Sequence, residues 1–134
     1  MEFVKEFATF LHQKEIIKFG EFTLASGKKS SYYVDLRLVP SYPHQFRTMI
    51  KYLQNNIVES IGLNSFDSLV SVPTGGLIIA SALAIEIVKP LIYVRSKPKD
   101  YGTSKSVEGQ IYEGMKVVMI DDVATTGGSV VNAI

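Results

Sequence analysis

The residues with the clearest chemical potential lie near the end of the chain, where two adjacent carboxylates precede a run of hydroxyls and glycines. Asp121 and Asp122 directly follow the apolar run 117–120, and Thr-Thr-Gly-Gly-Ser occupies residues 125–129. Glycines let backbone N–H groups converge on an anion, hydroxyls add donors, and a helix beginning here contributes the partial positive charge of its N-terminus. This pattern predicts a phosphate-binding turn.

The two carboxylates need a different ligand, because they would repel a bare phosphate. Carboxylate oxygens accept strong hydrogen bonds from sugar hydroxyls, and they also suit a magnesium ion or its bound water. An Asp-Asp pair or a Gly-Gly turn alone would mark no more than a strand end, but the whole string favours a ligand site. It has neither the Gly-Lys-Ser/Thr ending of a P-loop nor the Gly-x-Gly-x-x-Gly of a dinucleotide fold.

A second cluster of chemically useful residues lies near the N-terminus, in residues 19–37. Ser-Gly-Lys-Lys-Ser-Ser at 26–31 separates two apolar or aromatic arms. Lys28 supplies a cation, and Tyr32 and Tyr33 supply rings able to stack on a planar ligand. The segment is interpreted as a basic hairpin that would suit a pyrimidine acid, and an ordinary hairpin with exposed lysines is the alternative.

A third segment, residues 96–113, is polar and rich in lysine, with Lys97, Lys99 and Lys105 inside it and Lys116 just beyond. A segment of this length without regular structure is either a solvated surface loop or a lid over a site.

Hydrophobic periodicity predicts the elements that must position these three segments. We expect an amphipathic helix from the N-terminus to about Gly20, two strands and a turn within residues 22–38, and a second helix after Pro43. Short, continuously apolar strands are expected at 68–72, 91–94 and 117–120, with a buried helix at 77–88. Strands that alternate with helices predict an α/β fold with a parallel sheet, whose ligands bind beyond the carboxyl ends of the strands.

Composition narrows the class of protein further. A chain of 134 residues fits one domain, and 14 lysines and arginines against 13 acidic residues leave no global positive field for nucleic acid. The absence of cysteine excludes disulfides, thiolate nucleophiles and cysteine-based zinc sites. Charged residues interrupt the N-terminal apolar residues, so neither a signal peptide nor a membrane span is expected. These features favour a cytoplasmic enzyme.

All three segments resemble known motifs. Residues 117–130 resemble the phosphoribosyl-pyrophosphate motif of type I phosphoribosyltransferases, and residues 19–37 resemble the N-terminal signature of the orotate phosphoribosyltransferases. Residues 95–102 through Glu108 and Gly109 resemble the catalytic lid of that family, and residues 72–76 resemble its pyrophosphate loop. The resemblance implies the type I fold, a central parallel sheet flanked by helices. It divides the single domain into a helix and hairpin hood over residues 1–40 and a core over residues 41–134, with a flexible lid loop at 96–113.

The resemblance also implies an activity, in which the phosphoribosyl group of phosphoribosyl pyrophosphate passes to orotate for pyrimidine biosynthesis. Mg²⁺ would be held through substrate and water, with no direct protein ligand. The protein would be a homodimer in which Arg95, Lys99 and the Tyr101 position act on the site of the neighbouring subunit, with no nucleic-acid or membrane partner.

Individual residues take roles from the same resemblance. Asp121, Asp122 and Lys99 are the expected catalytic residues, with both carboxylates on the ribose hydroxyls. The expected phosphoribosyl-pyrophosphate contacts are Thr74, Gly75, Arg95, Ser96, Lys99, Tyr101, Asp121, Asp122, Val123, Ala124, Thr125, Thr126, Gly127, Gly128 and Ser129. The expected orotate contacts are Lys28, Tyr32, Tyr33 and Thr125.

The chain departs from the family pattern at several places. Many members carry lysine at the positions of Ala25, Gly75 and Ser96, and Lys28, Lys29, Lys97 and Lys99 are the candidates to compensate. Members also continue past the helix that begins near Thr126. We therefore expect a shortened member, with the sheet edge beside 117–120 exposed or covered by another chain, and with orotate bound more weakly than phosphoribosyl pyrophosphate.

Two alternatives remain open at this stage. One is a purine or uracil phosphoribosyltransferase, which would share residues 121–129 but not the signature at 19–37. The other is a regulator that binds phosphoribosyl pyrophosphate without turnover, which the substituted lysine positions favour.

Overall fold

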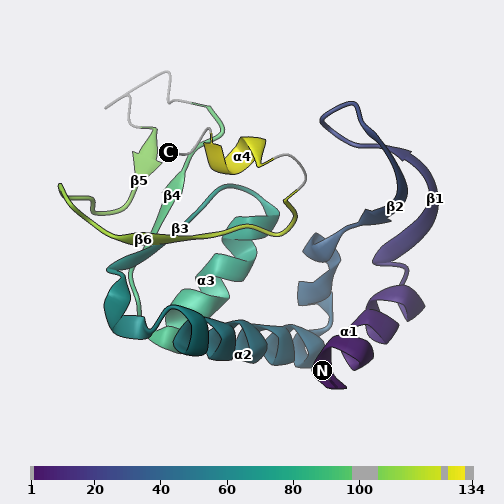
Figure 1. The fold of residues 1–134 in the computed structure, drawn as a ribbon, viewed down its shortest axis with the longest axis horizontal. Helices are drawn as coiled ribbons and strands as arrows, with labels where there is room; N and C mark the ends of the chain where they lie inside the picture. The colour runs from purple at the N-terminus through teal and green to yellow at the C-terminus, as the bar shows by residue number, and fades with distance from the viewer. Residues whose placement is uncertain (1, 98–105, 125–126, 132–134) are drawn as a thin grey trace. The chain divides into compact units, whose positions relative to one another are not determined.

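The computed structural model describes residues 2–97, 106–124 and 127–131 (Figure 1). The chain divides into two compact units, residues 1–49 and 50–134. The predicted single domain with a hood and a core stays a prediction.

The first unit contains a helix, a hairpin and a short 3₁₀ helix, namely α1 (Glu2–Gln13), β1 (Ile17–Thr23), β2 (Lys29–Val34) and η1 (Leu36–Ser41). The prediction that the first helix continues to about Gly20 is wrong, because the chain leaves the helix at Glu15, whose φ of 54° is left-handed. The fully buried Ile16 then accepts a hydrogen bond from the N–H of Asp35 at 2.9 Å. Ile16 and Ile17 fit a helical period, but β-branched side chains also favour extended backbone, and β1 begins at Ile17.

The hairpin itself is confirmed. β1 and β2 pair antiparallel from Ile17 opposite Val34 to Thr23 opposite Lys29, with an irregular register between Phe19 and Phe22. The first strand begins at Ile17 and not at Phe22 as expected.

The second unit is built around a four-stranded sheet in the order β5-β4-β3-β6. Its elements follow α2 (Pro43–Ser60), which starts in the first unit: η2 (Leu63–Ser65), β3 (Ser68–Ser71), α3 (Gly75–Ile87), β4 (Leu91–Val94), β5 (Val107–Glu108), β6 (Val117–Ile120) and α4 (Gly128–Val131). β3 pairs parallel with both β4 and β6, which confirms the predicted parallel sheet.

β5 corrects two expectations. It pairs antiparallel with β4, placing Tyr93 opposite Glu108 and Val94 opposite Val107, so the sheet is mixed. It also lies within the segment 96–113 that was expected to be loop throughout. A pair of residues such as Val-Glu carries too little periodicity to mark a strand.

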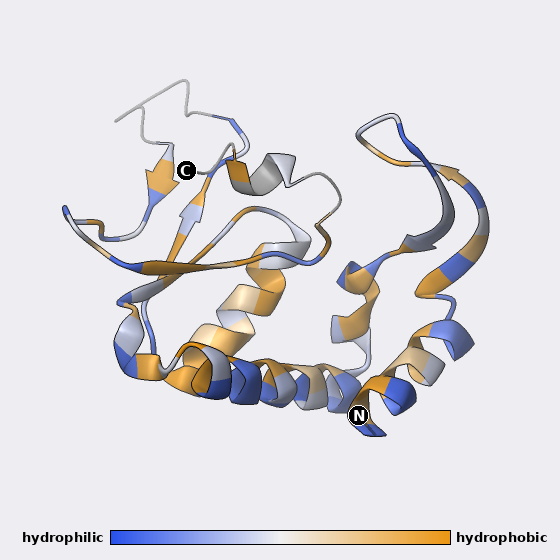
Figure 2. Ribbon diagram, viewed as in Figure 1, coloured by the Kyte–Doolittle hydropathy of each residue, from blue (hydrophilic) through white to orange (hydrophobic). Residues whose placement is uncertain are grey.

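β3 and α3 form the centre of the core. All four residues of β3 are buried, and α3 packs against β3, β4 and β6. Figure 2 shows α3 mostly hydrophobic along its length, whereas α2 mixes both kinds of residue. The buried hydroxyls of Ser68 and Ser71 donate hydrogen bonds to the carbonyls of Pro90, at 2.9 Å, and Ile120, at 2.7 Å.

β6 lies at the edge of the sheet. Within residues 2–97, 106–124 and 127–131, β3 is the strand that pairs with it. The expectation that its other edge is exposed or covered by another chain stays a prediction. Of the helices that the structure describes, none is long and apolar enough to cross a membrane.

Gly109 fixes how closely β5 lies on β4, and its substitution tests that contact. Its φ is 112°, and an added Cβ would lie 2.6 Å from Cγ2 of the buried Ile92. Gly114 also has positive φ, 79°, but a Cβ there would meet nothing within 4 Å. We expect Gly114→Ala to lose about 1–2 kcal/mol of unfolding free energy through its backbone conformation alone. Gly109→Ala should lose a further 1–3 kcal/mol, roughly, because the added methyl overpacks the contact. Chemical denaturation measures both values, and equal losses would contradict the close approach.

Candidate active site

The three parallel strands bring their carboxyl ends to one edge of the sheet, and the predicted site residues of the second unit follow those ends. Thr74 and Gly75 follow β3, Arg95 and Ser96 follow β4, and Asp121 follows β6. Parallel strands bind ligands beyond this edge. The predicted phosphoribosyl-pyrophosphate contacts that directly follow these three strands therefore lie at one edge of the sheet.

Asp121 lies against the first turn of α3. A Cβ on Gly76 would lie 2.8 Å from Oδ1 of Asp121 and 3.0 Å from Oγ of Ser71, so no other residue fits there without displacing one of them. The backbone N–H of Asp122 donates a hydrogen bond to the same Oδ1 at 2.9 Å. Burial raises the pKa of Asp121, and the charge of Asp122 adds to the rise. This carboxylate is thus held in place before any ligand binds.

The turn after β3 leads into α3. Thr74 is exposed and precedes the helix, whereas Gly75 is buried in the first turn, and the peptide bond between Pro73 and Thr74 is cis. The position where the resemblance led us to expect lysine in many members is thus a buried glycine in this chain.

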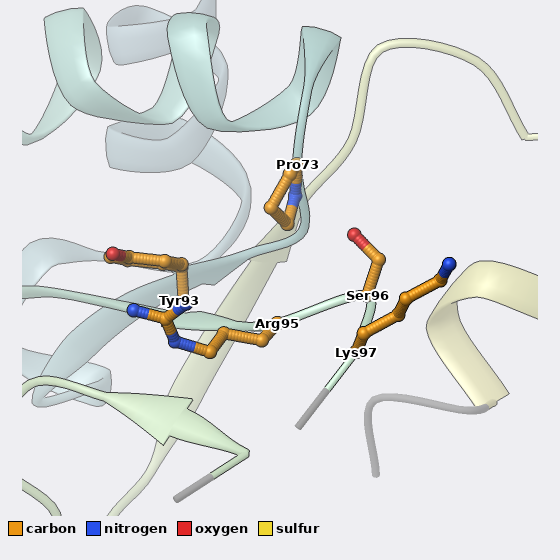
Figure 3. Close-up of a pocket in the computed structure, with 5 residues that line it drawn as sticks. All are labelled: Pro73, Tyr93, Arg95, Ser96 and Lys97. Atoms are coloured by element: carbon orange, nitrogen blue, oxygen red, sulfur yellow. The ribbon is translucent and has the colours of Figure 1, made fainter. Parts of the chain in front are cut away.

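A pocket of about 320 Å³ lies beside the ends of β3 and β4, lined by Pro73, Tyr93, Arg95, Ser96 and Lys97 (Figure 3). A volume of this order suits a small ligand. Figure 3 shows the side chain of Arg95 running back alongside Tyr93, with Ser96 and Lys97 on the other side. Lys97, one of the candidates to compensate for Ser96, therefore lines the same pocket as Ser96.

Arg95 is paired with a carboxylate. Its Nε donates a hydrogen bond to Oε1 of Glu108 at 2.7 Å, and both side chains are partly buried. The lid motif gave Arg95 a role and included Glu108 without one, and it did not include Tyr93. The alternation of Tyr93 and Arg95 along one strand face was the available signal for Tyr93.

The predicted phosphate turn is described in part. Val123 and Ala124 are exposed, Gly127 has a φ of 74°, and α4 begins at Gly128. Thr125 and Thr126 lie outside the described residues, as do Lys99 and Tyr101 of the expected lid, and the side chain of Ser129 is not described.

The predicted orotate contacts Lys28, Tyr32 and Tyr33 belong to the first unit. Lys28 is exposed in the turn of the hairpin, and Tyr32 is 54% exposed. Tyr33 lies on the opposite strand face, where its hydroxyl accepts a hydrogen bond from Nη2 of Arg37 at 3.2 Å. Arg37 also binds both oxygens of Asp35, and this hydrogen bonding lowers the pKa of Asp35. The sequence had not singled out this pair.

The described residues contain no group of three or more His, Cys, Asp or Glu side chains able to hold a metal ion. Asp121 and Asp122 supply oxygen ligands of the kind that Mg²⁺ prefers, and a Mg²⁺ site there would need further oxygens from its ligand or from water.

Comparison with known proteins places this site in a family. The phosphoribosyl transferase domain matches residues 44–134. An orotate phosphoribosyltransferase from Cenarchaeum symbiosum is 55% identical over 133 residues, 99% of this chain and 66% of that protein. Another from Pyrococcus furiosus is 40% identical over 129 residues, 96% of this chain and 70% of that protein. The crystal structure of the orotate phosphoribosyltransferase from Aeropyrum pernix has a TM-score of 0.74 at 35% identity, covering 94% of this chain and 70% of that one.

The chain therefore belongs to the phosphoribosyltransferase family with the type I fold, and within it to the orotate phosphoribosyltransferases. It spans about two thirds of the length of these curated relatives. The resemblances at residues 19–37 and 117–130 thus predicted the family.

The raised pKa of Asp121 leads to a test of the two carboxylates. Because the pKa of Asp121 is higher in the folded protein than in the unfolded chain, the free energy of unfolding falls as the pH rises from the unfolded pKa through the folded one. The charge of Asp121 therefore does not stabilise the fold at neutral pH. Asp121→Asn should therefore keep or raise the melting temperature, since an amide oxygen still accepts from the N–H of Asp122. Both Asp121→Asn and Asp122→Asn should impair the use of phosphoribosyl pyrophosphate by at least tenfold, roughly, because each removes a charged acceptor.

Steady-state kinetics and thermal melting measure these effects on the same samples. Unchanged kinetics in both variants would contradict the ribose role of the carboxylates. A sharp fall in the melting temperature of Asp121→Asn would show that its charge is structural.

Proposed function

We propose that this protein is an orotate phosphoribosyltransferase that acts in pyrimidine biosynthesis. In the proposed reaction a ring nitrogen of orotate attacks C1 of the ribose of phosphoribosyl pyrophosphate. The new bond joins nitrogen to C1, the C1–O bond breaks, diphosphate leaves with that electron pair, and the proton of the ring nitrogen is released to water. The product is orotidine 5′-monophosphate.

The observation that supports this proposal most strongly is sequence identity to an orotate phosphoribosyltransferase across both residues 19–37 and residues 117–130. The 55% identity to the Cenarchaeum symbiosum orotate phosphoribosyltransferase extends over 99% of the chain, so it includes the hairpin as well as the strand-end motif. Similarity to a purine or uracil phosphoribosyltransferase would be expected at residues 121–129 but not at the hairpin signature, residues 19–37. The hairpin thus favours orotate over the other bases.

The proposal takes the roles of the residues from the family resemblance, and their positions at the ends of the strands support it. Asp121 and Asp122 hold the ribose hydroxyls, and Arg95 and Lys97 hold the diphosphate in the pocket beside β4. By the family resemblance, Lys99 and Tyr101 add to the diphosphate site, and residues 125–129 hold the 5′-phosphate. Such positioning and charge neutralisation need no protein nucleophile.

Magnesium belongs to the proposal as a cofactor that neutralises the charge of the diphosphate when bound. The carboxylates of Asp121 and Asp122 are the oxygen donors near which it would lie, with the other oxygens coming from substrate and water. The proposal also includes a homodimer that shares lid residues between subunits, and a cytoplasmic location.

Mixing the protein with orotate, phosphoribosyl pyrophosphate and Mg²⁺ and following the absorbance of orotate tests the activity. We expect orotate to be consumed. When adenine, hypoxanthine or uracil replaces orotate, we expect chromatography to show no nucleotide product. Turnover of one of these bases would favour the alternative transferase. Binding of phosphoribosyl pyrophosphate without any turnover would favour the regulator.

Lys97 provides a sharper test of the diphosphate site. Lys97→Ala should raise the KM for phosphoribosyl pyrophosphate about tenfold, since a charge-assisted hydrogen bond contributes roughly 1.5–3 kcal/mol. Lys116 is the matched control, because it is exposed and precedes β6, at the end of the strand opposite Asp121. Lys116→Ala should leave the KM unchanged. An equal effect of both substitutions would indicate general electrostatics and not a contact in the pocket.

A further inference from the structure

The pairing of Arg95 with Glu108 joins the end of β4 to β5, 13 residues further along the chain. The antiparallel ladder sets Tyr93 opposite Glu108 and Val94 opposite Val107, and it continues through a hydrogen bond from the N–H of Arg95 to the carbonyl of Ser106 at 2.7 Å. In this register Arg95 and Glu108 are diagonal neighbours on one face, a separation that long side chains can span. Their 2.7 Å contact is therefore built into the sheet.

Glu108 is itself held firmly. The residue after it, Gly109, lies so close to β4 that a Cβ would meet Ile92 at 2.6 Å. The carboxylate of Glu108 thus belongs to β5, which pairs with β4, the strand that leads into the pocket. Its partner Arg95 lines that pocket together with Lys97.

The atoms used in this pairing matter for ligand binding. A guanidinium has five N–H donors, and a hydrogen bond from Nε to Glu108 leaves the terminal nitrogens to contact an anion. A free arginine side chain must lose rotamer freedom when it binds a phosphate, whereas a side chain already fixed loses less.

From this geometry we infer that Glu108 is a positioning residue, which holds Arg95 on the pocket wall so that its terminal nitrogens bind the diphosphate of the substrate. The inference rests on the proposed function of the pocket as a diphosphate site. Glu108 touches no substrate atom in this role, and its effect on the diphosphate passes through Arg95.

Isothermal titration with inorganic diphosphate tests the inference without orotate or turnover. Glu108→Ala removes the acceptor for Nε and should weaken diphosphate binding about five- to tenfold, which is less than the loss of a direct hydrogen bond to a charged group because Glu108 acts through Arg95. Glu108→Gln keeps an acceptor oxygen and should stay within about twofold of the parent protein. Glu86→Ala is the matched control, an exposed glutamate at the C-terminal end of α3, and should leave diphosphate binding unchanged.

Two further variants separate positioning from folding and from charge. Glu108→Asp keeps the charge but is one methylene shorter, so it should weaken binding as alanine does while preserving a folded protein. In an Arg95→Ala background, Glu108→Ala should have no further effect, whereas a folding defect would act in both backgrounds.

The outcomes are distinct. Tighter binding by both Glu108→Ala and Glu108→Gln would show that Glu108 only opposes the anion by its charge, and would overturn the inference. Parent-like binding by Glu108→Asp, or an equal effect in the Arg95→Ala background, would overturn it as well. A parent protein that binds no diphosphate would overturn it together with the pocket assignment. Diphosphate binding without orotate turnover would contradict the proposed activity and leave this role of Glu108 intact.

Discussion

The parallel pairing of β3 with β4 on one side and β6 on the other is the constraint on which the second unit depends. β3 is buried at every position, and the hydroxyls of Ser68 and Ser71 bind carbonyls at or next to the neighbouring strands. Because the three strands run in one direction, their carboxyl ends and the turns that follow come to a single edge. The candidate active site is a consequence of this pairing.

Close backbone approach at two glycines turns that edge into a defined site. At Gly76 the first turn of α3 comes against the carboxylate of Asp121, and at Gly109 the antiparallel strand β5 comes against Ile92 of β4. The contact at Gly76 holds the carboxylate of Asp121 in place, and the contact at Gly109 places Glu108 within hydrogen-bonding distance of Arg95. Both contacts hold charged groups in place before a ligand arrives, which lowers the ordering cost of binding.

The sequence predicted the parts of the fold that carry strong local signals. β4 and β6 were located at their observed bounds because each is a continuous apolar run between polar segments. β3, Ser-Leu-Val-Ser, was located to within one residue, because the predicted run included Val72. The end of α1 was wrong since Ile16 and Ile17 fit both a helical and an extended pattern, and the left-handed turn at Glu15 leaves no signal in residue type. β5 was missed because its pairing with β4, and not its two residues, makes it a strand. The site residues were predicted from motifs, but Glu108 and the contact of Asp121 with Gly76 depend on tertiary packing, which one sequence does not display.

The central claim is that the turns after β3, β4 and β6 form one binding site for phosphoribosyl pyrophosphate. Titration of this ligand with Mg²⁺, followed by the backbone amide resonances of the isotopically labelled protein, tests that claim directly. The account predicts that the amides of residues 74–76, 95–97 and 121–124 shift together and give the same dissociation constant. Shifts confined to one of these turns, or different dissociation constants for the three, would contradict it.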